Sequence, residues 1–483
     1  MCPGLREEPR RRGALSSMIL TILGGGGFRV PLVYSALLAD REPGRVTELR
    51  LFDADAARLG VVARVLSELA EGMPDAPIVR LFTELSEALP GTDFIFSAIR
   101  VGGLEGRAAD ERIALEHGVI GQETVGAGGI SYALRTIPVV LDIAEAVKKH
   151  APEAWFINFT NPAGVITEAM TEVLGTKVVG ICDSPVGLAR RCLLAAGIHR
   201  GAAAFRDGSV EIDYFGLNHL GWLRGLVVDG EDVLPRLLAD AGAIESFEEG
   251  RLFGASWIQA LGAVPNEYLH YYYFRREALD ADRRAESTRG AYLARQQSSF
   301  YNGLLNGNDG GAAPALRSPT SKAALGLWEK TKLDREETYM QSNRDASGTF
   351  ERAPEDLVTG GYESVALAIM RAIRQGEAAR LILNVPNRGT LAELDADAVI
   401  EAPCLVDAGQ IRLLPTRPLP DYARGLVVNA KAVERATIHA ALTGSRRSAY
   451  KALAMNPLVD SVRVAQELLD AYIDHFEQLQ YLR

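Results

Sequence analysis

Four consecutive glycines after an apolar run are the clearest local signal for a ligand in this sequence. Residues 24–27 follow the apolar residues 18–23 and precede a stretch, 28–40, whose apolar positions have helical spacing. A glycine-rich turn between a strand and a helix lets the backbone approach a pyrophosphate, and the helix N-terminus supplies N–H donors and a positive dipole. The spacing matches the start of a G-x-G-x-x-G motif, although Arg29 or Val30 replaces its third glycine. We expect the following residues to contact a dinucleotide: Gly24, Gly26, Gly27 and Phe28.

An acidic residue, Asp53, ends the next strand-like run, residues 48–52. A carboxylate at this place accepts hydrogen bonds from both ribose hydroxyls of an adenosine. It favours NAD over NADP, because the 2′-phosphate of NADP would meet a like charge. The interval from the glycines to Asp53 is longer than the usual ~20 residues. A plain tight turn followed by a surface aspartate is therefore the alternative interpretation.

A cysteine and a histidine stand where functional side chains could gather. Cys182 follows the strand-like run 177–181, and functional groups on parallel sheets cluster at the carboxyl ends of strands. His219 lies in a strand-like segment bounded by Gly and Asn, within residues 216–222 (GLNHLGW). Taken singly, a cysteine of this kind is more often a buried apolar thiol, and such a histidine is more often a hydrogen-bonded core residue.

Alternating strand and helix patterns must position these residues. Short apolar runs at 48–52, 77–82, 93–99, 155–159 and 177–181 are separated by helical stretches, which predicts a doubly wound parallel sheet of the Rossmann type. After residue 205 the pattern changes to longer strands at 210–229, a loop-rich segment at 290–350, strands at 381–387 and 398–413, and helices at 362–374, 424–443 and 459–480. We expect an α/β protein with a disordered extension (1–17), an NAD-binding Rossmann-like domain (18–200) and an α+β domain for substrate, metal and oligomerisation (201–483).

Composition excludes several classes of protein. The 483 residues include 52 Lys and Arg against 62 Asp and Glu, a net charge of −10 that does not suit a nucleic-acid partner. No apolar run approaches the roughly 20 residues of a membrane helix, so no membrane partner is expected. Four cysteines (Cys2, Cys182, Cys192 and Cys404) are too few for a disulfide framework and suit a reducing compartment, the cytoplasm.

Five ordered motifs carry a resemblance to a known family. They are GQETVGAGGISYALRTIPV (121–139), NFTNPAGVITEA (158–169), GICDSPVGL (180–188), GLNHLGW (216–222) and NEYLHYYY (266–273). With them the chain resembles glycoside hydrolase family 4, the NAD- and metal-dependent glycosidases, and within it most closely the 6-phospho-β-glucosidases. The resemblance extends from about residue 18 to the C-terminus.

The resemblance implies a route of hydrolysis outside the usual two-carboxylate scheme. NAD oxidises C3 of the sugar, the ketone acidifies the C2 proton, a base removes that proton, and the aglycone leaves by elimination; water then adds and the hydride returns to C3. A divalent metal stabilises the charge on the sugar oxygens. A soft thiolate ligand by itself indicates zinc or iron, and only the resemblance indicates manganese. The implied substrates are 6-phospho-β-glucosides such as cellobiose 6-phosphate, or aryl glycosides.

Particular residues match positions that carry roles in this family. The metal ligands implied by the resemblance are Cys182 and His219, the base is Tyr268, and the substrate-binding residues are Arg107, Asn161 and Arg289. Two arginines suit a phosphate, which accepts charge-assisted hydrogen bonds. Near the cofactor we expect Asn158 to face the nicotinamide, Arg100 and Val101 to line the groove, and Glu123 to support the metal through water.

Asp183 leaves the linkage specificity open. Many β-specific relatives carry Asn at this position, whereas several α-specific ones use Asp as the acid that protonates the leaving oxygen. Asp183 could instead orient water and metal, or cap the helix that begins near Pro185. The alternatives within the family are a 6-phospho-α-glucosidase or an α-galacturonidase. An alternative of another class is an NAD-dependent 2-hydroxyacid dehydrogenase. The family and the apolar C-terminal helices suggest a homodimer or homotetramer.

Overall fold

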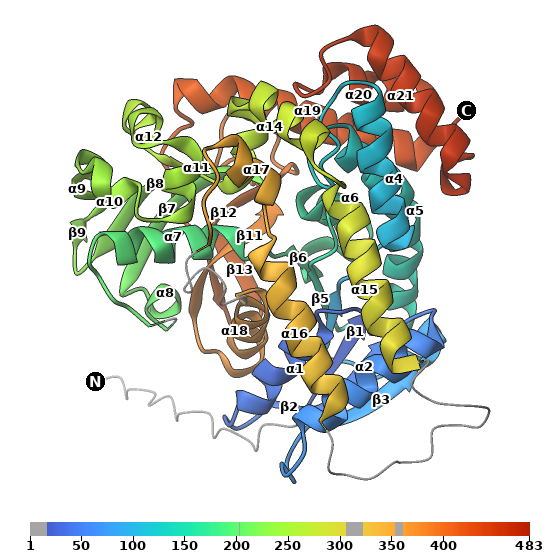
Figure 1. The fold of residues 1–483 in the computed structure, drawn as a ribbon. Coiled ribbons are helices and arrows are strands. Elements are labelled where there is room, and N and C mark those ends of the chain that lie inside the picture. Colours follow the sequence, from blue (N-terminus) through green and yellow to red (C-terminus); the bar gives the residue numbers. More distant parts are fainter. Residues whose placement is uncertain (1–16, 202, 306–321, 353–360) are drawn as a thin grey trace, which may run out of the picture.

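A nine-stranded sheet forms the centre of the protein (Figure 1). The computed structural model describes residues 17–201, 203–305, 322–352 and 361–483, so the expected extension 1–17 lies outside the described residues except for Ser17. Six parallel strands have the order β3-β2-β1-β4-β5-β6, the strand order of a Rossmann fold. They are β1 (Met18–Leu23), β2 (Val46–Phe52), β3 (Ile78–Phe82), β4 (Phe94–Ser97), β5 (Trp155–Asn158) and β6 (Val178–Gly180). The predicted doubly wound α/β class is confirmed.

The register of the parallel strands brings their carboxyl ends to one edge. Leu23 pairs with Phe52 on one side and with Ser97 on the other. Ser97 in turn pairs with Asn158, and Asn158 with Gly180. The glycine turn and Asp53 follow directly after Leu23 and Phe52, and Cys182 comes two residues after Gly180. Segments that are far apart in sequence therefore meet along this edge.

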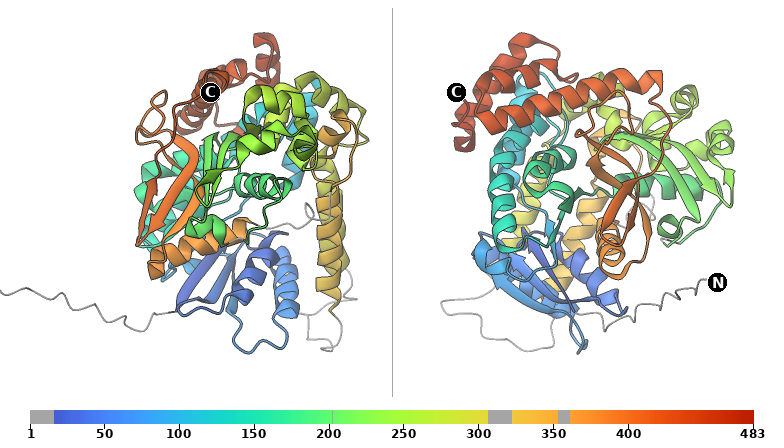
Figure 2. Two further views of the ribbon diagram at one scale, coloured as in Figure 1. Left: turned by 90° about the vertical axis from the view of Figure 1, so that its left-hand side faces the viewer. Right: turned by 180° about the vertical axis from the view of Figure 1, so that it is seen from behind.

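Helices cover both faces of the sheet, as expected for continuously apolar strands. One face packs against α1 (Val30–Ala39), α2 (Ala56–Leu69) and α18 (Tyr362–Gln375). The other face packs against α5 (Gly126–His150) and α6 (Ala163–Leu174). The C-terminal helices α19 (Asp421–Thr443), α20 (Arg446–Met455) and α21 (Val462–His475) belong to the same hydrophobic cluster. Seen from behind, α19 runs across the top of the molecule (Figure 2). The other α-helices described within residues 17–200 are α3 (Leu85–Ala88), α4 (Gly103–Glu116) and α7 (Ser184–Ala195).

Three C-terminal strands extend the same sheet. Strand β11 (Ala379–Pro386) pairs antiparallel with β6, β12 (Val399–Asp407) antiparallel with β11, and β13 (Gln410–Leu413) antiparallel with β12. The boundary expected at residue 200 therefore does not separate two sheets, and the proposed division into domains stays a prediction. A second, smaller sheet contains β7 (Val210–Leu217), β8 (Leu220–Val228), β9 (Glu231–Asp232) and β10 (Val264–Pro265). Short helices surround it: α8 (Ala204–Asp207), α9 (Leu234–Ala239), α10 (Ala241–Ile244), α11 (Glu248–Phe253) and α12 (Ala255–Leu261).

The prediction of a loop-rich segment at 290–350 is wrong for the described residues. They form α15 (Arg289–Leu305), α16 (Ala323–Glu337) and α17 (Gln341–Ala346), preceded by α13 (His270–Tyr273) and α14 (Arg275–Arg284). Helices α15 and α16 lie side by side and reach α2 at the base of the molecule (Figure 1). Buried Phe300 and Trp328 attach them to the core, so tertiary packing rather than local propensity stabilises them. In the described part of the chain, no helix combines the length and the apolar character needed to cross a bilayer.

Candidate active site

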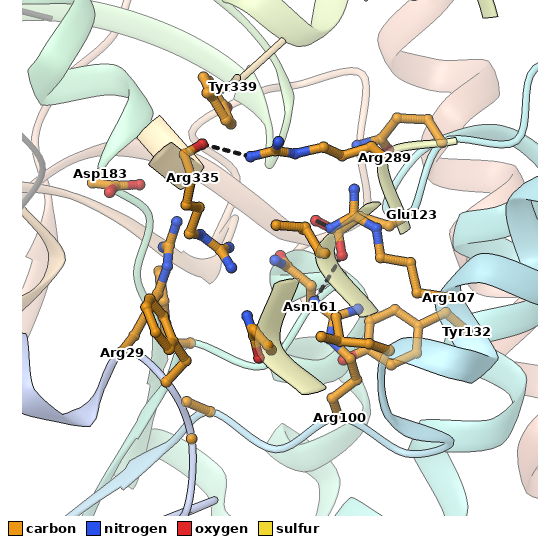
Figure 3. Close-up of a pocket in the computed structure, with 18 of the residues that line it drawn as sticks. Arg29, Arg100, Arg107, Glu123, Tyr132, Asn161, Asp183, Arg289, Arg335 and Tyr339 are labelled. Carbon is orange, nitrogen blue, oxygen red and sulfur yellow. Dashed lines mark hydrogen bonds and ion pairs between the residues drawn. The ribbon is translucent and has the colours of Figure 1, made fainter. Parts of the chain in front are cut away.

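A cavity of about 1120 Å³ opens at the carboxyl edge of the parallel strands (Figure 3). Its walls come from the glycine turn, the loops after β4, β5 and β6, the β7–β8 hairpin, and helices α4, α15, α16 and α17. This edge is where open α/β sheets bind ligands. Most of the side chains predicted to carry chemistry line this cavity.

The glycine turn leaves no room for side chains. Gly24 has φ +82°, and a Cβ there would lie 2.8 Å from the carbonyl oxygen of Ala98. The N–H of Gly26 donates to Oδ2 of Asp53 (3.0 Å), so the predicted acid is tied to the turn. Gly24, Phe28 and Asp53 line the cavity, as does Gly27. These features fit a dinucleotide whose pyrophosphate approaches the backbone and whose ribose meets a carboxylate.

Two of the expected cofactor residues do not reach the cavity wall. Asn158 is completely buried, and its Nδ2 donates to the carbonyls of Thr160 and Ala163 and to Oγ1 of Thr167. The expectation that its side chain faces the nicotinamide is therefore wrong, because these bonds hold the amide inside the protein. Gly26 lies behind the turn, where its carbonyl accepts a hydrogen bond from the hydroxyl of Tyr301 (2.7 Å).

Two of the expected cofactor-groove residues do line the cavity, Arg100 and Val101. The Arg100 guanidinium pairs with the Glu123 carboxylate (2.7 Å) and lies 5.0 Å from the ring centre of Tyr132. Glu123 thus enters the site as an ion-pair partner of arginines. Its neighbours Arg100 and Arg107 hold the pKa of its carboxyl down at about 2, against the effect of burial.

The predicted metal ligands meet at the wall. His219 is not inside a strand: it lies with Asn218 in the two-residue turn between β7 and β8, with φ +61°. This turn directs its Nε2 to within 3.7 Å of Sγ of Cys182. Burial lowers the pKa of His219 to about 4, which keeps the imidazole neutral. Burial, with Glu401 and Asp183 nearby, raises the pKa of the Cys182 thiol, so a metal must displace its proton.

A short chain of hydrogen bonds sets the tautomer of His219. The backbone N–H groups of Thr124 and Val125 both donate to one side-chain atom of Gln122, which must therefore be its oxygen. The Thr124 hydroxyl also contacts that oxygen (2.9 Å) and can only donate to it. Oγ1 of Thr124 is then left to accept the proton of Nδ1 of His219 (2.8 Å). Nε2 is consequently the unprotonated nitrogen, and its lone pair points toward Cys182, as a metal ligand requires.

The metal pair has few protein donors around it. Among the described residues, no group of three or more His, Cys, Asp or Glu side chains is placed to hold a metal. A thiolate and an imidazole suit a borderline divalent ion. The donor set therefore fits a metal that keeps several positions open for substrate oxygens and water.

Tyr268 stacks directly on the His219 ring, with 3.7 Å between ring centres and 10° between planes. Its hydroxyl lies 3.3 Å from that of Tyr339. Burial, followed by the charges of Glu267 and Glu123, raises the pKa of Tyr268, so the protein alone does not make it a base. A cation near the phenol is needed to reverse that direction.

Asp183 lies at the cavity, at the position before α7. Its side chain makes no capping hydrogen bond to the helix, so the helix-cap interpretation is not supported. Glu267, which was not predicted, lines the same wall, and burial raises the pKa of its carboxyl to about 7. It accepts a hydrogen bond from the Ser184 hydroxyl (2.7 Å).

The three predicted substrate residues also line the cavity, but in different electrostatic settings. Arg107 pairs with both Glu111 and Glu123, each at 2.8 Å. Asn161 precedes a cis peptide bond to Pro162. Within the described residues, Arg289 donates only to neutral oxygens, those of the Thr338 hydroxyl (2.6 Å) and the Arg335 carbonyl (2.8 Å).

Several cavity residues had no local sequence signal. Arg29 is noted in the sequence only as a replacement for a motif glycine, and Arg335 and Tyr339 fall in the segment expected to be loop-rich. Their convergence depends on helix packing. Residues 323–337 are rich in good helix formers (Ala, Leu, Lys and Glu), and this propensity is a signal that could have indicated a helix around Arg335.

Comparison with known proteins agrees with this geometry. Residues 19–196 match the model of "Family 4 glycosyl hydrolase" and residues 214–459 that of "Family 4 glycosyl hydrolase C-terminal domain". The chain is 29% identical to a probable 6-phospho-beta-glucosidase of Bacillus subtilis (94% of this chain, 95% of the relative) and 28% identical to a 6-phospho-alpha-glucosidase of Leptotrichia buccalis (94% and 97%). A similar solved structure is the Thermotoga maritima 6-phospho-beta glucosidase with manganese, NAD+ and glucose-6-phosphate (TM-score 0.75, 26% identity, 96% of this chain, 100% of that one).

Proposed function

Because the chain belongs to glycosyl hydrolase family 4, we propose that it is an NAD- and divalent-metal-dependent 6-phosphoglucosidase that acts on β-glucosides. The observation that carries this proposal is the meeting of Cys182, His219 and Tyr268 beside the glycine turn in one cavity. A 2-hydroxyacid dehydrogenase would need the glycine turn but not the Cys–His pair.

The cofactors follow from the donor sets of the cavity. NAD would lie along the glycine turn with its ribose at Asp53, and a metal, manganese by analogy with the similar structure, would lie between Cys182 and His219. When bound, they supply a reversible hydride acceptor and positive charge next to the sugar oxygens.

Residues of this chain would carry the proton transfers and the binding. Tyr268 would remove the C2 proton once the nearby metal lowers its pKa. Asp183, on the cavity wall, would hold the proton given to the leaving oxygen. Arg107, already paired with two carboxylates, and Asn161 would hydrogen-bond the sugar.

A second candidate is the 6-phospho-α-glucosidase reaction. The observation that favours it is Asp183 itself, because its carboxylate lines the cavity and makes no capping bond to α7, as suits an acid that protonates the leaving oxygen. Relatives with both specificities match the chain to a similar degree.

The deciding experiment compares p-nitrophenyl β-glucoside 6-phosphate, its α-anomer and the unphosphorylated β-glucoside, each with NAD, Mn²⁺ and a thiol reductant. Turnover of the phosphorylated β-anomer that is lost without NAD or metal would support the proposal. Turnover of the α-anomer alone would select the second candidate. Turnover of the unphosphorylated glucoside at an equal rate, or no dependence on NAD, would refute both.

A further inference from the structure

Three arginines from distant parts of the chain converge in the cavity. Arg29 ends the glycine turn before α1, Arg289 begins α15, and Arg335 lies in the last turn of α16. All three line the cavity, and Figure 3 shows the Arg29 and Arg335 side chains extending into it from different elements. Only Arg289 carried an expected role.

The three guanidinium groups have few close ion-pair partners. Among the described residues, no carboxylate lies within 4.0 Å of the guanidinium of Arg29 or of Arg289. Arg29 instead lies over the rings of Phe159 (5.9 Å) and Tyr362 (5.6 Å). Arg335 has one carboxylate nearby, that of Glu336 at 3.9 Å, and Glu336 also faces Arg352 at 3.5 Å.

The neighbouring pair Arg100 and Arg107 provides the contrast. Glu123 pairs with both of these arginines, and Glu111 pairs with Arg107. Two cations and two carboxylates therefore form a nearly neutral unit. Such a unit can hydrogen-bond sugar hydroxyls, but it offers little attraction for a doubly charged anion.

The protonation behaviour of Arg335 and Arg289 agrees with an anion site, whereas nearby Tyr362, Glu336 and Asp183 raise the pKa of Arg29 against the effect of burial. Burial, followed by repulsion from Arg29 and Arg289, lowers the pKa of Arg335 to about 9. Burial, followed by repulsion from Arg107, lowers the pKa of Arg289 to about 10. Both groups remain protonated at neutral pH, but burial and neighbouring arginines destabilise their charged forms. A bound dianion would remove this cost.

We propose that Arg29 and Arg335, together with Arg289, form the seat for the phosphate dianion of the substrate. This inference rests on the proposed function, because it assigns the phosphate of that substrate to a particular place. It assigns Arg29 and Arg335 to substrate recognition and gives Arg107 a role with the sugar hydroxyls. The same chemistry would suit the diphosphate of NAD, since Arg29 follows the glycine turn, and the experiment separates the two sources.

The test measures binding of glucose 6-phosphate, glucose and NAD to Arg335→Gln, Arg335→Lys and Arg29→Gln by calorimetry. Arg295→Gln, on the exposed side of α15, is the matched control. For Arg335→Gln and Arg29→Gln we expect glucose 6-phosphate to bind roughly 10- to 100-fold more weakly, with glucose and NAD unchanged. Arg335→Lys should lie between Arg335→Gln and the wild type, and Arg295→Gln should match the wild type.

Thermal unfolding provides a second readout that does not need turnover. Without ligand, Arg335→Gln should unfold at or above the wild-type temperature, because the substitution removes a repelled charge. Glucose 6-phosphate should then raise its midpoint less than it raises that of the wild type. If Arg335→Gln does not fold but Arg335→Lys does, the binding comparison is made with Arg335→Lys and Arg29→Gln.

The outcomes separate this inference from the proposed function. An active 6-phosphoglucosidase whose glucose 6-phosphate affinity is indifferent to Arg335→Gln and Arg29→Gln overturns the seat and leaves the function standing. Weaker NAD binding with unchanged glucose 6-phosphate binding also overturns it, by assigning these arginines to the diphosphate. If the wild type shows no 6-phosphoglucosidase turnover, but Arg335→Gln and Arg29→Gln selectively weaken glucose 6-phosphate binding, the seat is supported and the proposed function is refuted.

Discussion

Thr124 is predicted to control metal binding without touching the metal. In the wild type its Oγ1 accepts the Nδ1 proton of His219, which leaves Nε2 bare beside Cys182. In Thr124→Val the tautomer with a bare Nε2 must bury an unpaired N–H group. The other tautomer places its proton on Nε2, toward the sulfur, and blocks the metal.

The size of the effect follows from this burial. An unsatisfied buried donor costs about 1–3 kcal/mol. At about 1.4 kcal/mol for each tenfold in affinity, Mn²⁺ should bind roughly 5- to 150-fold more weakly. Loss of an outer-shell partner of a metal-ligating histidine typically costs a similar 10- to 100-fold.

Titration of free Mn²⁺ by electron paramagnetic resonance, with NAD present and no substrate, measures this affinity directly. Thr124→Ser is the matched control because it keeps the hydroxyl, and it should bind Mn²⁺ like the wild type. Wild-type Mn²⁺ affinity in a folded Thr124→Val protein would refute the tautomer argument. Equal weakening in Thr124→Ser would also refute it, because the hydroxyl would then not be the deciding group.

Three further substitutions test other parts of the site. Tyr268→Phe should abolish exchange of the substrate C2 hydrogen with solvent deuterium while NAD still binds; retained exchange would remove Tyr268 as the base. Asp53→Ala should weaken NAD about tenfold in a fluorescence titration and NADP much less, because the carboxylate meets the ribose. Burial raises the pKa of Glu401 to about 7. In the folded protein, Glu401 therefore keeps a proton that it loses above about pH 4.5 in the unfolded chain. The free energy of unfolding consequently falls as the pH rises from about 4.5 to about 7. Glu401→Gln should flatten the fall of the unfolding temperature with pH over that window, and an unchanged slope would contradict this reasoning.

The parallel half of the fold could be predicted from the sequence because its signals are local. Residues 18–23 form the expected strand with the expected ends, and the glycine turn and Asp53 follow strands as the pattern indicates. Cys182 and His219 meet because strand ends share one edge of the sheet and a hairpin turn reaches it. That His219 occupies the turn itself, at positive φ, has no signature in hydrophobic periodicity.

The failures involve interactions between distant residues. Asn158 stands at a strand end, as a ligand-facing residue would, but the start of α6 supplies acceptors that hold its amide inside. Arg29 and Arg335 are 306 positions apart, and no pattern around either indicates the other. Composition also suggested loops at 290–350. The apolar residues that stabilise α15 and α16 have their partners in the first seventy residues of the chain, and the local sequence does not show such distant contacts.

Those partners connect the helices that carry Arg289 and Arg335 with the glycine turn. The hydroxyl of Tyr301 donates to the carbonyl of Gly26, and the indole of Trp328 donates to that of Phe28 (2.9 Å). Helices α15 and α16, which carry Arg289 and Arg335, are thus fastened to the turn whose backbone would meet a dinucleotide. Hydride transfer requires reacting atoms within about 3–3.5 Å, and a misplacement of 1 Å is costly. The bonds from Tyr301 and Trp328 hold α15, α16 and the glycine turn in one frame, across the boundary that the sequence pattern predicts near residue 200.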